Sequence, residues 1–152
     1  MIKEYVQYWD KNKNLLDGYF KTHDQRDYSD YLDLVKLLFE IVINPDIPTR
    51  AFDLSKITVI DDGDYQGTQI FIIPADTYQP NVSEYVYTNT YYGSCSGCDT
   101  LQGIQSYGLP DENQIKDYMI LCLQLLQSCA YMIDGEEEIK EMEIYLGGKN
   151  NG

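Results

Sequence analysis

Hydrophobic and polar residues recur along this chain with two different periods, and each period predicts a different kind of element. Apolar side chains in residues 2–20 follow helical spacing, which predicts a first helix with a candidate interruption at the polar residues 10–14. Ser29 or Asp30 can cap a second helix, because a short polar side chain accepts hydrogen bonds from the first free backbone N–H groups. We expect that helix to end near Ile43.

The middle of the chain has short apolar runs between turn-forming residues, a pattern typical of β-strands. Strands are predicted at residues 57–60, 68–73 and 84–92. The acidic segment 61–64 contains an Asp-Gly pair, which favours a tight hairpin turn. Since antiparallel strands can be joined by short connections, we expect an antiparallel meander.

The last third of the chain returns to helical spacing. Asp111 precedes Gln114 by three positions, a capping-box arrangement that predicts the start of a helix. We expect this helix to run to about Ile133, with its apolar stripe in the core rather than in a groove for a partner. A short acidic amphipathic helix is predicted over residues 136–145.

These elements predict an α+β fold, with a small antiparallel three-stranded sheet packed on one face by the N- and C-terminal helices. The 152 residues are enough for one domain, which we place at residues 1–146, followed by a flexible tail at 147–152. A hydrophobic content of 43% is too high for a disordered acidic chain.

Charge is distributed unevenly along the chain, whose formal net charge is -14. Residues 1–26 hold five basic and four acidic side chains, whereas the remaining residues hold six basic and 21 acidic ones. This balance argues against direct binding to nucleic acid or anionic lipid, because phosphates attract Lys and Arg. No apolar stretch approaches the roughly 20 residues that cross a bilayer, and the start does not resemble a signal peptide, so we expect a cytoplasmic protein.

Four cysteines suggest metal or redox chemistry. Cys95 and Cys98 form a CxxC pair, but Cys122 and Cys129 are two helical turns apart, too far to share one zinc ion with each other. His23 is the only histidine. A redox site is the other interpretation, although the pair lacks the alternating βαβ pattern of thioredoxin-like proteins. We therefore expect neither a metal nor a cofactor, in a chain whose expected compartment is the reducing cytosol.

The acidic turn is the densest set of oxygen ligands in the chain. Read from Asp62, it resembles the opening of a calcium loop, but position twelve is Ile73 where such a loop needs Glu. An acidic hairpin turn explains the residues better, with a weak Ca²⁺ or Mg²⁺ site as the alternative. The sequence contains no nucleophile elbow and no phosphate-binding glycine motif, so an enzyme is the weaker class.

Two motifs resemble a pair found in a family of small phage and prophage proteins that has no assigned activity. They are residues 64–67 (DYQG) and 92–102 (YGSCSGCDTLQ). The resemblance implies a viral origin, and it predicts that the motifs meet in space, either as a binding pocket or as a structural corner. The candidate pocket residues are Gln66, Gly67, Tyr92, Gly93, Cys95, Cys98 and Asp99.

A small, acidic, phage-like chain suggests a protein that binds host machinery. We expect an acidic surface that engages a basic surface of a host protein, as DNA-mimicking inhibitors such as anti-CRISPR proteins do. Its expected contacts are Asp61, Asp62, Asp64, Tyr65, Glu136, Glu137, Glu138, Glu141 and Glu143. Alternatively, the charge only maintains solubility. Other functions left open are a small-molecule or metal-dependent protein that uses the acidic turn and the CxxC pair, and a phage structural or assembly component.

Overall fold

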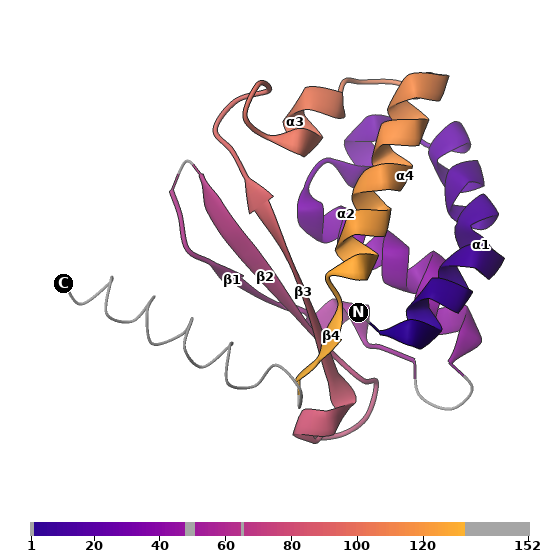
Figure 1. Ribbon diagram of the computed structural model, residues 1–152, viewed down its shortest axis with the longest axis vertical. Helices are drawn as coiled ribbons and strands as arrows, with labels where there is room; N and C mark the ends of the chain where they lie inside the picture. The colour runs from indigo at the N-terminus through magenta and orange to yellow at the C-terminus, as the bar shows by residue number, and fades with distance from the viewer. Residues whose placement is uncertain (1, 48–50, 65, 133–152) are drawn as a thin grey trace.

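The computed structural model describes residues 2–47, 51–64 and 66–132, and it confirms an α+β fold. Figure 1 shows the helices gathered on one side of an antiparallel sheet. The helices are α1 (Lys3–Thr22), α2 (Tyr31–Leu37), α3 (Thr100–Ile104) and α4 (Glu112–Gln127), and the strands are β1 (Thr58–Asp61), β2 (Gly67–Pro74), β3 (Tyr85–Tyr92) and β4 (Ala130–Tyr131). The predicted helix over 136–145 and tail over 147–152 lie outside the described residues.

Helix α1 continues without a break through residues 10–14, where the sequence suggested an interruption. The reason is Asn12, which is buried and donates a side-chain hydrogen bond to the Val42 carbonyl at 2.9 Å. Its amide also contacts Asp46. A polar side chain whose hydrogen bonds are satisfied can be buried within a helix without breaking it.

Helix α2 begins as predicted, with Asp30 as its N-cap in a capping box with Asp33. The chain then continues from Leu38 to Ile43 as a π-helix. A 3₁₀ turn at Asn44–Asp46 extends the helical segment past the end that the sequence predicted near Ile43. Among the residues described, no helix combines the length and apolarity required to span a bilayer.

The sheet has four strands in the order β1-β2-β3-β4, not the three that the sequence predicted. The missing strand, β4, pairs Tyr131 with Val86 and Ala130 with Tyr87. Helical spacing of apolar residues continues past residue 127, which is why the sequence predicted helix to about Ile133. The unpaired edge of β3 offers hydrogen bonds to an extended segment, and this tertiary pairing replaces the last turns of the predicted helix.

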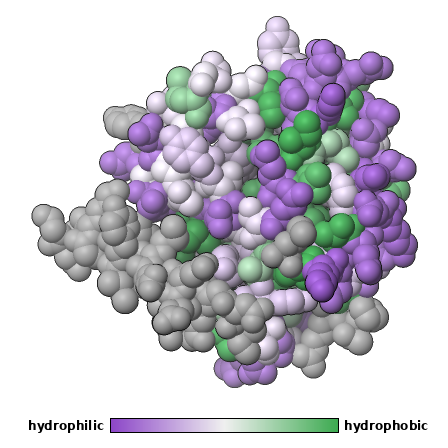
Figure 2. All heavy atoms as spheres, viewed as in Figure 1, coloured by the Kyte–Doolittle hydropathy of each residue, from purple (hydrophilic) through white to green (hydrophobic). Residues whose placement is uncertain are grey.

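The two faces of the sheet bury different sets of apolar residues. Phe71, Ile73 and Val86 belong to the main core shared with the helices, and the buried Thr88 donates a hydrogen bond to the Leu125 carbonyl of α4 at 2.7 Å. A second, smaller cluster on the other face is formed by Ile70, Ile72 and Tyr87, with Ile60, Tyr85, Ala130 and Met132 beside it. Figure 2 shows hydrophilic residues along the side of the molecule where α1 lies, as expected for an amphipathic helix.

A buried glutamine joins the loop before α4 to the helical half. Gln25 is 1% exposed, and its side-chain carbonyl accepts hydrogen bonds from the Tyr118 hydroxyl at 2.8 Å and from the Ser106 backbone N–H at 3.1 Å. Its amide donates to the Ser106 hydroxyl at 3.1 Å. The network satisfies every one of these buried groups, which is the condition for a polar side chain in a core.

We predict that Gln25→Ala lowers the free energy of unfolding by about 1–3 kcal/mol, because it leaves the Tyr118 hydroxyl buried without this acceptor. Urea denaturation followed by circular dichroism measures the change. Gln124→Ala is the matched control, since Gln124 is exposed on α4 and its loss is expected to change stability by less than about 0.5 kcal/mol. Equal effects of the two substitutions would contradict the role of the network.

Candidate functional site

The hairpin between β1 and β2 is closed by its own carboxylates. Asp61 accepts hydrogen bonds from the Gly63 backbone N–H and from the Gln69 side chain, both at 3.0 Å. Asp62 accepts one from the Thr68 backbone N–H. A Cβ at Gly67 would collide with the Asp62 carboxylate, which explains why the first motif ends in glycine. Asp61 and Asp62, two of the acidic residues predicted to contact a partner, therefore also stabilise the turn.

Tyr92 connects the second motif to this hairpin. It lies opposite Gly67 in the β2–β3 register. Its hydroxyl donates to the Asp61 carboxylate at 2.5 Å and lies 2.8 Å from the Gly63 carbonyl oxygen. The two motifs thus meet in space, as the sequence predicted.

The hydrogen bond between Tyr92 and Asp61 shifts the pKa values of both groups. The negative carboxylate raises the pKa of Tyr92 to about 12. Partial burial alone would raise the pKa of Asp61, but the hydrogen bonds from Tyr92, Gln69 and Gly63 outweigh burial and lower it. Asp61 consequently keeps its negative charge across the physiological pH range.

The loop after β3 is anchored by the buried carboxylate of Asp99, which is 5% exposed. It accepts hydrogen bonds from the Gly93 N–H at 2.7 Å, the Tyr31 hydroxyl at 2.9 Å and the Gln102 N–H at 3.0 Å. Tyr31 is the first residue of α2, and its hydroxyl oxygen accepts from the Leu101 N–H at 3.2 Å. Because Asp99 is also the N-cap of α3, this side chain starts a helix that the sequence analysis missed.

Cys95 and Cys98 are exposed free thiols on this loop. The Cys95 carbonyl accepts hydrogen bonds from the N–H groups of Cys98 at 3.0 Å and Asp99 at 2.9 Å, which folds the segment into a tight turn. Cys98 Sγ lies 2.9 Å from the Cys95 nitrogen and 3.7 Å from the Ser94 hydroxyl. Hydrogen bonding with the Cys95 side chain contributes most to lowering the pKa of the Cys98 thiol, and the Ser94 hydroxyl contributes next. A Cβ at Gly93 would collide with the Cys98 carbonyl, so the turn requires glycine there.

The remaining cysteines belong to the core. Cys122 and Cys129 are fully buried, and burial raises the pKa of each to about 12. In the described part of the chain, no three His, Cys, Asp or Glu side chains come together in a way that could hold a metal ion. The alternative of a metal-dependent protein therefore gains no support from these residues.

Two further residues of the predicted sites lie at the hairpin. Asp64 is exposed at the hairpin, and Gln66 lies with its side-chain oxygen 3.5 Å from the Tyr91 hydroxyl. Tyr65, Glu136, Glu137, Glu138, Glu141 and Glu143 lie outside the described residues.

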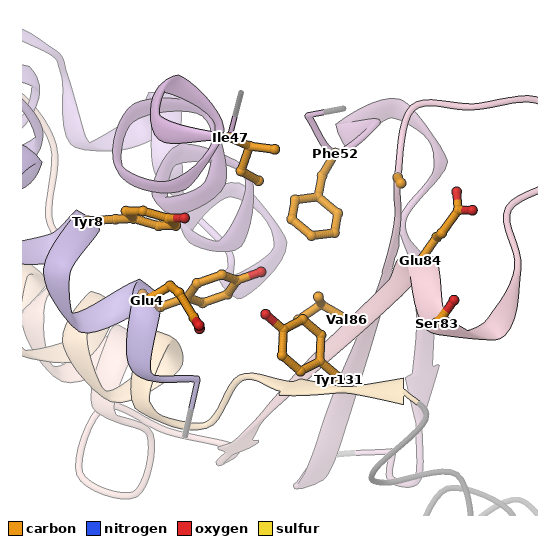
Figure 3. A pocket seen from close by; sticks show the side chains of 10 residues that line it. Glu4, Tyr8, Ile47, Phe52, Ser83, Glu84, Val86 and Tyr131 are labelled. Carbon is orange, nitrogen blue, oxygen red and sulfur yellow. The ribbon is translucent and has the colours of Figure 1, made fainter. Parts of the chain in front are cut away.

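A cavity of about 580 Å³ lies between α1 and the sheet, and its described lining contains none of the motif residues. Figure 3 shows Tyr8, Phe52 and Tyr131 with their rings directed into it from separate segments of the chain, beside Glu4. The sequence analysis missed this cavity. Tyr5 and Tyr8 occur three positions apart on α1 and share a helical face, but no local pattern links them to Phe52 or Tyr131.

Comparison with protein-family models, with curated proteins and with solved structures finds no match for this chain. The resemblance of the two motifs to phage proteins stays a prediction.

We predict that Asp99→Ala lowers the free energy of unfolding by about 2–3 kcal/mol, because the buried N–H of Gly93 and the Tyr31 hydroxyl lose a charged acceptor. Asp99→Asn should cost less, since one acceptor oxygen remains. Chemical denaturation measures both variants. Asp64→Ala, at an exposed position of the hairpin, is the control and should change stability by less than about 0.5 kcal/mol. A similar loss in the control would show that the carboxylate of Asp99 has no special role.

We also predict that iodoacetamide modifies Cys95 and Cys98 in the folded protein and leaves Cys122 and Cys129 unmodified until unfolding. Because the pKa of Cys98 is lowered, the pH at which its alkylation rate is half-maximal should lie below the ordinary thiol value of about 8.5. Peptide mass spectrometry of samples taken over time measures the modified fraction of each cysteine. Ser94→Ala should move the Cys98 midpoint upward, and an unchanged midpoint would contradict the contribution of the Ser94 hydroxyl.

Proposed function

We propose that this chain is an acidic binding protein that engages a basic surface on a partner protein. The observation that carries the proposal is the separation of charge along the fold. Residues 57–115 contain eight acidic and no basic side chains. This segment includes β1, β2, β3 and α3, so three of the four strands and the hairpin turn contribute only negative charge.

Several basic side chains of the helical half and of the connector before β1 form ion pairs with nearby carboxylates. The ion pairs are Lys11–Asp46, Lys13–Asp10, Lys21–Asp17, Arg26–Asp24 and Lys56–Asp53. Each pair forms within the N-terminal 56 residues. These local pairs reduce the positive field that would otherwise offset the carboxylates of the sheet.

The hairpin end of the sheet combines this charge with exposed apolar surface. Asp61 is held in its charged form by its hydrogen bonds, and Asp64 is exposed beside it. Tyr91 on β3 is 54% exposed, and its hydroxyl lies 3.5 Å from the side-chain oxygen of Gln66 at the hairpin. Tyrosine supplies apolar contact area with a polar tip, a composition enriched at protein interfaces.

A basic partner surface of the kind that binds nucleic acid fits this arrangement. Such surfaces use Lys and Arg to neutralise phosphates, and ionised carboxylates present the same sign of charge. Inhibitors that mimic DNA act in this way. The resemblance to phage proteins supports a host protein as the partner, and a host-defence nuclease of the anti-CRISPR target type is one candidate.

We predict that the immobilised protein retains nucleic-acid-binding proteins from a bacterial lysate at about 0.05 M salt and releases them at about 0.5 M, because screening weakens contacts between exposed charges. Added double-stranded DNA should displace them, since it competes for the same basic surface. Quantitative mass spectrometry of the eluates measures both effects.

A matched pair of double variants tests the location of the surface. Asp62→Asn with Asp64→Asn removes two charges from the hairpin and keeps an acceptor oxygen at each position, and retention should fall by about tenfold. Asp10→Asn with Glu40→Gln removes the same charge from exposed positions in the helical half and should leave retention unchanged. Equal losses in both variants would mean that only the net charge matters, and the proposal of a defined surface would be rejected.

A further inference from the structure

The exposed CxxC turn places two nucleophilic side chains next to each other at the surface. Cys98 Sγ lies 2.9 Å from the Cys95 nitrogen and 3.3 Å from the Cys95 oxygen. The turn is closed twice on the Cys95 carbonyl, by the N–H groups of Cys98 and Asp99. Both thiols are free and exposed, whereas the two cysteines of α4 and its end are buried.

The backbone that holds this turn is anchored outside the two cysteines. Gly93 donates to the Asp99 carboxylate at 2.7 Å, and Tyr31 of α2 donates to the same carboxylate at 2.9 Å. These bonds involve no sulfur atom. The thiols can therefore change their covalent state while the buried anchors of the loop stay in place.

We propose that Cys95 and Cys98 form a redox-active dithiol that reduces disulfides and is converted to an intramolecular disulfide. In the first step the Cys98 thiolate attacks one sulfur of the substrate disulfide, which forms a mixed disulfide and releases one substrate thiolate. In the second step the Cys95 thiolate attacks Cys98 Sγ and the second substrate thiolate leaves. Two electrons pass from the dithiol to the substrate disulfide, and the two protons of the cysteines end on the two released thiols.

Cys98 is the attacking thiol in this scheme because its sulfur has the better environment for a negative charge. The Cys95 N–H donates to Cys98 Sγ, and the Ser94 hydroxyl lies 3.7 Å away. Neighbouring polar groups lower the pKa of the Cys98 thiol. A thiol that is more fully ionised at neutral pH reacts faster with disulfides, provided that its pKa stays near the ambient pH.

The acidic hairpin sets the preferred class of substrate. Asp61 and Gly63 contact Tyr92, the residue that immediately precedes the loop, and Figure 1 shows the hairpin turn and the loop at the same end of the sheet. Negative charge at this end repels an anionic disulfide and attracts a cationic one. We therefore expect the dithiol to react with cystamine, a cationic disulfide, about tenfold faster than with oxidised glutathione at low salt.

The experiment mixes the reduced protein with each disulfide and follows the products by intact-mass and peptide mass spectrometry. The wild-type chain should lose two hydrogen atoms, with a Cys95–Cys98 cross-link and an unchanged circular dichroism spectrum. Cys95→Ser should accumulate a stable mixed disulfide on Cys98, because the resolving thiol is gone. Cys98→Ser should form its adduct on Cys95 several-fold more slowly.

Two controls separate this proposal from ordinary thiol reactivity. Cys122→Ala keeps the exposed pair and should react like the wild-type chain. Raising salt to about 0.5 M should reduce the preference for cystamine, since the Debye length falls with ionic strength. The proposal is overturned if the wild-type chain ends with substrate adducts on both cysteines, forms only cross-linked dimers, or unfolds on oxidation. It is equally overturned if Cys98→Ser reacts as fast as Cys95→Ser. None of these outcomes depends on whether a partner protein binds.

Discussion

The carboxylate of Asp99 joins the loop after β3 and the start of α3 to α2, which lies 68 residues away in the sequence. It is buried, and a buried carboxylate is tolerated only when hydrogen-bond donors compensate for the loss of water. Gly93 at the end of β3, Tyr31 at the start of α2 and Gln102 in α3 supply these donors. Through Gly93 the constraint reaches Tyr92, whose hydroxyl in turn holds the acidic hairpin. The position of the loop relative to both the helices and the sheet depends on this one side chain.

Structural and electrostatic roles coincide in the acidic residues of the hairpin. Asp61 and Asp62 accept hydrogen bonds that close the turn, and the bonds to Asp61 also favour its charged form. A substitution that removes a carboxylate therefore changes both the shape and the field of this end of the sheet. Amide substitutions separate the two effects, because they keep an acceptor oxygen and remove the charge.

The four cysteines show how one residue type acquires two different chemistries within one fold. Cys122 and Cys129 lie in the core, where the absence of water keeps the thiols protonated. Cys95 and Cys98 lie on a turn in which the Cys95 N–H donates to Cys98 Sγ, and this hydrogen bond favours the thiolate at Cys98. The exposed pair also shares its end of the sheet with the acidic hairpin.

Local patterns in the sequence were sufficient for most of the elements. Capping residues at Asp30 and Asp111 located two helix starts, and short apolar runs between turn-forming residues located three strands, since both signals arise from neighbouring residues. The spacing of Cys95 and Cys98 likewise singled out the CxxC pair, whose thiols are exposed in the structure. Strand β4 was missed because its helical spacing was overridden by the open edge of β3, a contact that no local pattern contains. The continuity of α1 depended on a hydrogen bond from Asn12 to a carbonyl thirty residues away, and the meeting of the two motifs depended on the register of β2 and β3. Local propensity is a property of the sequence by itself, whereas register, burial and buried hydrogen-bond partners exist only once the chain has folded.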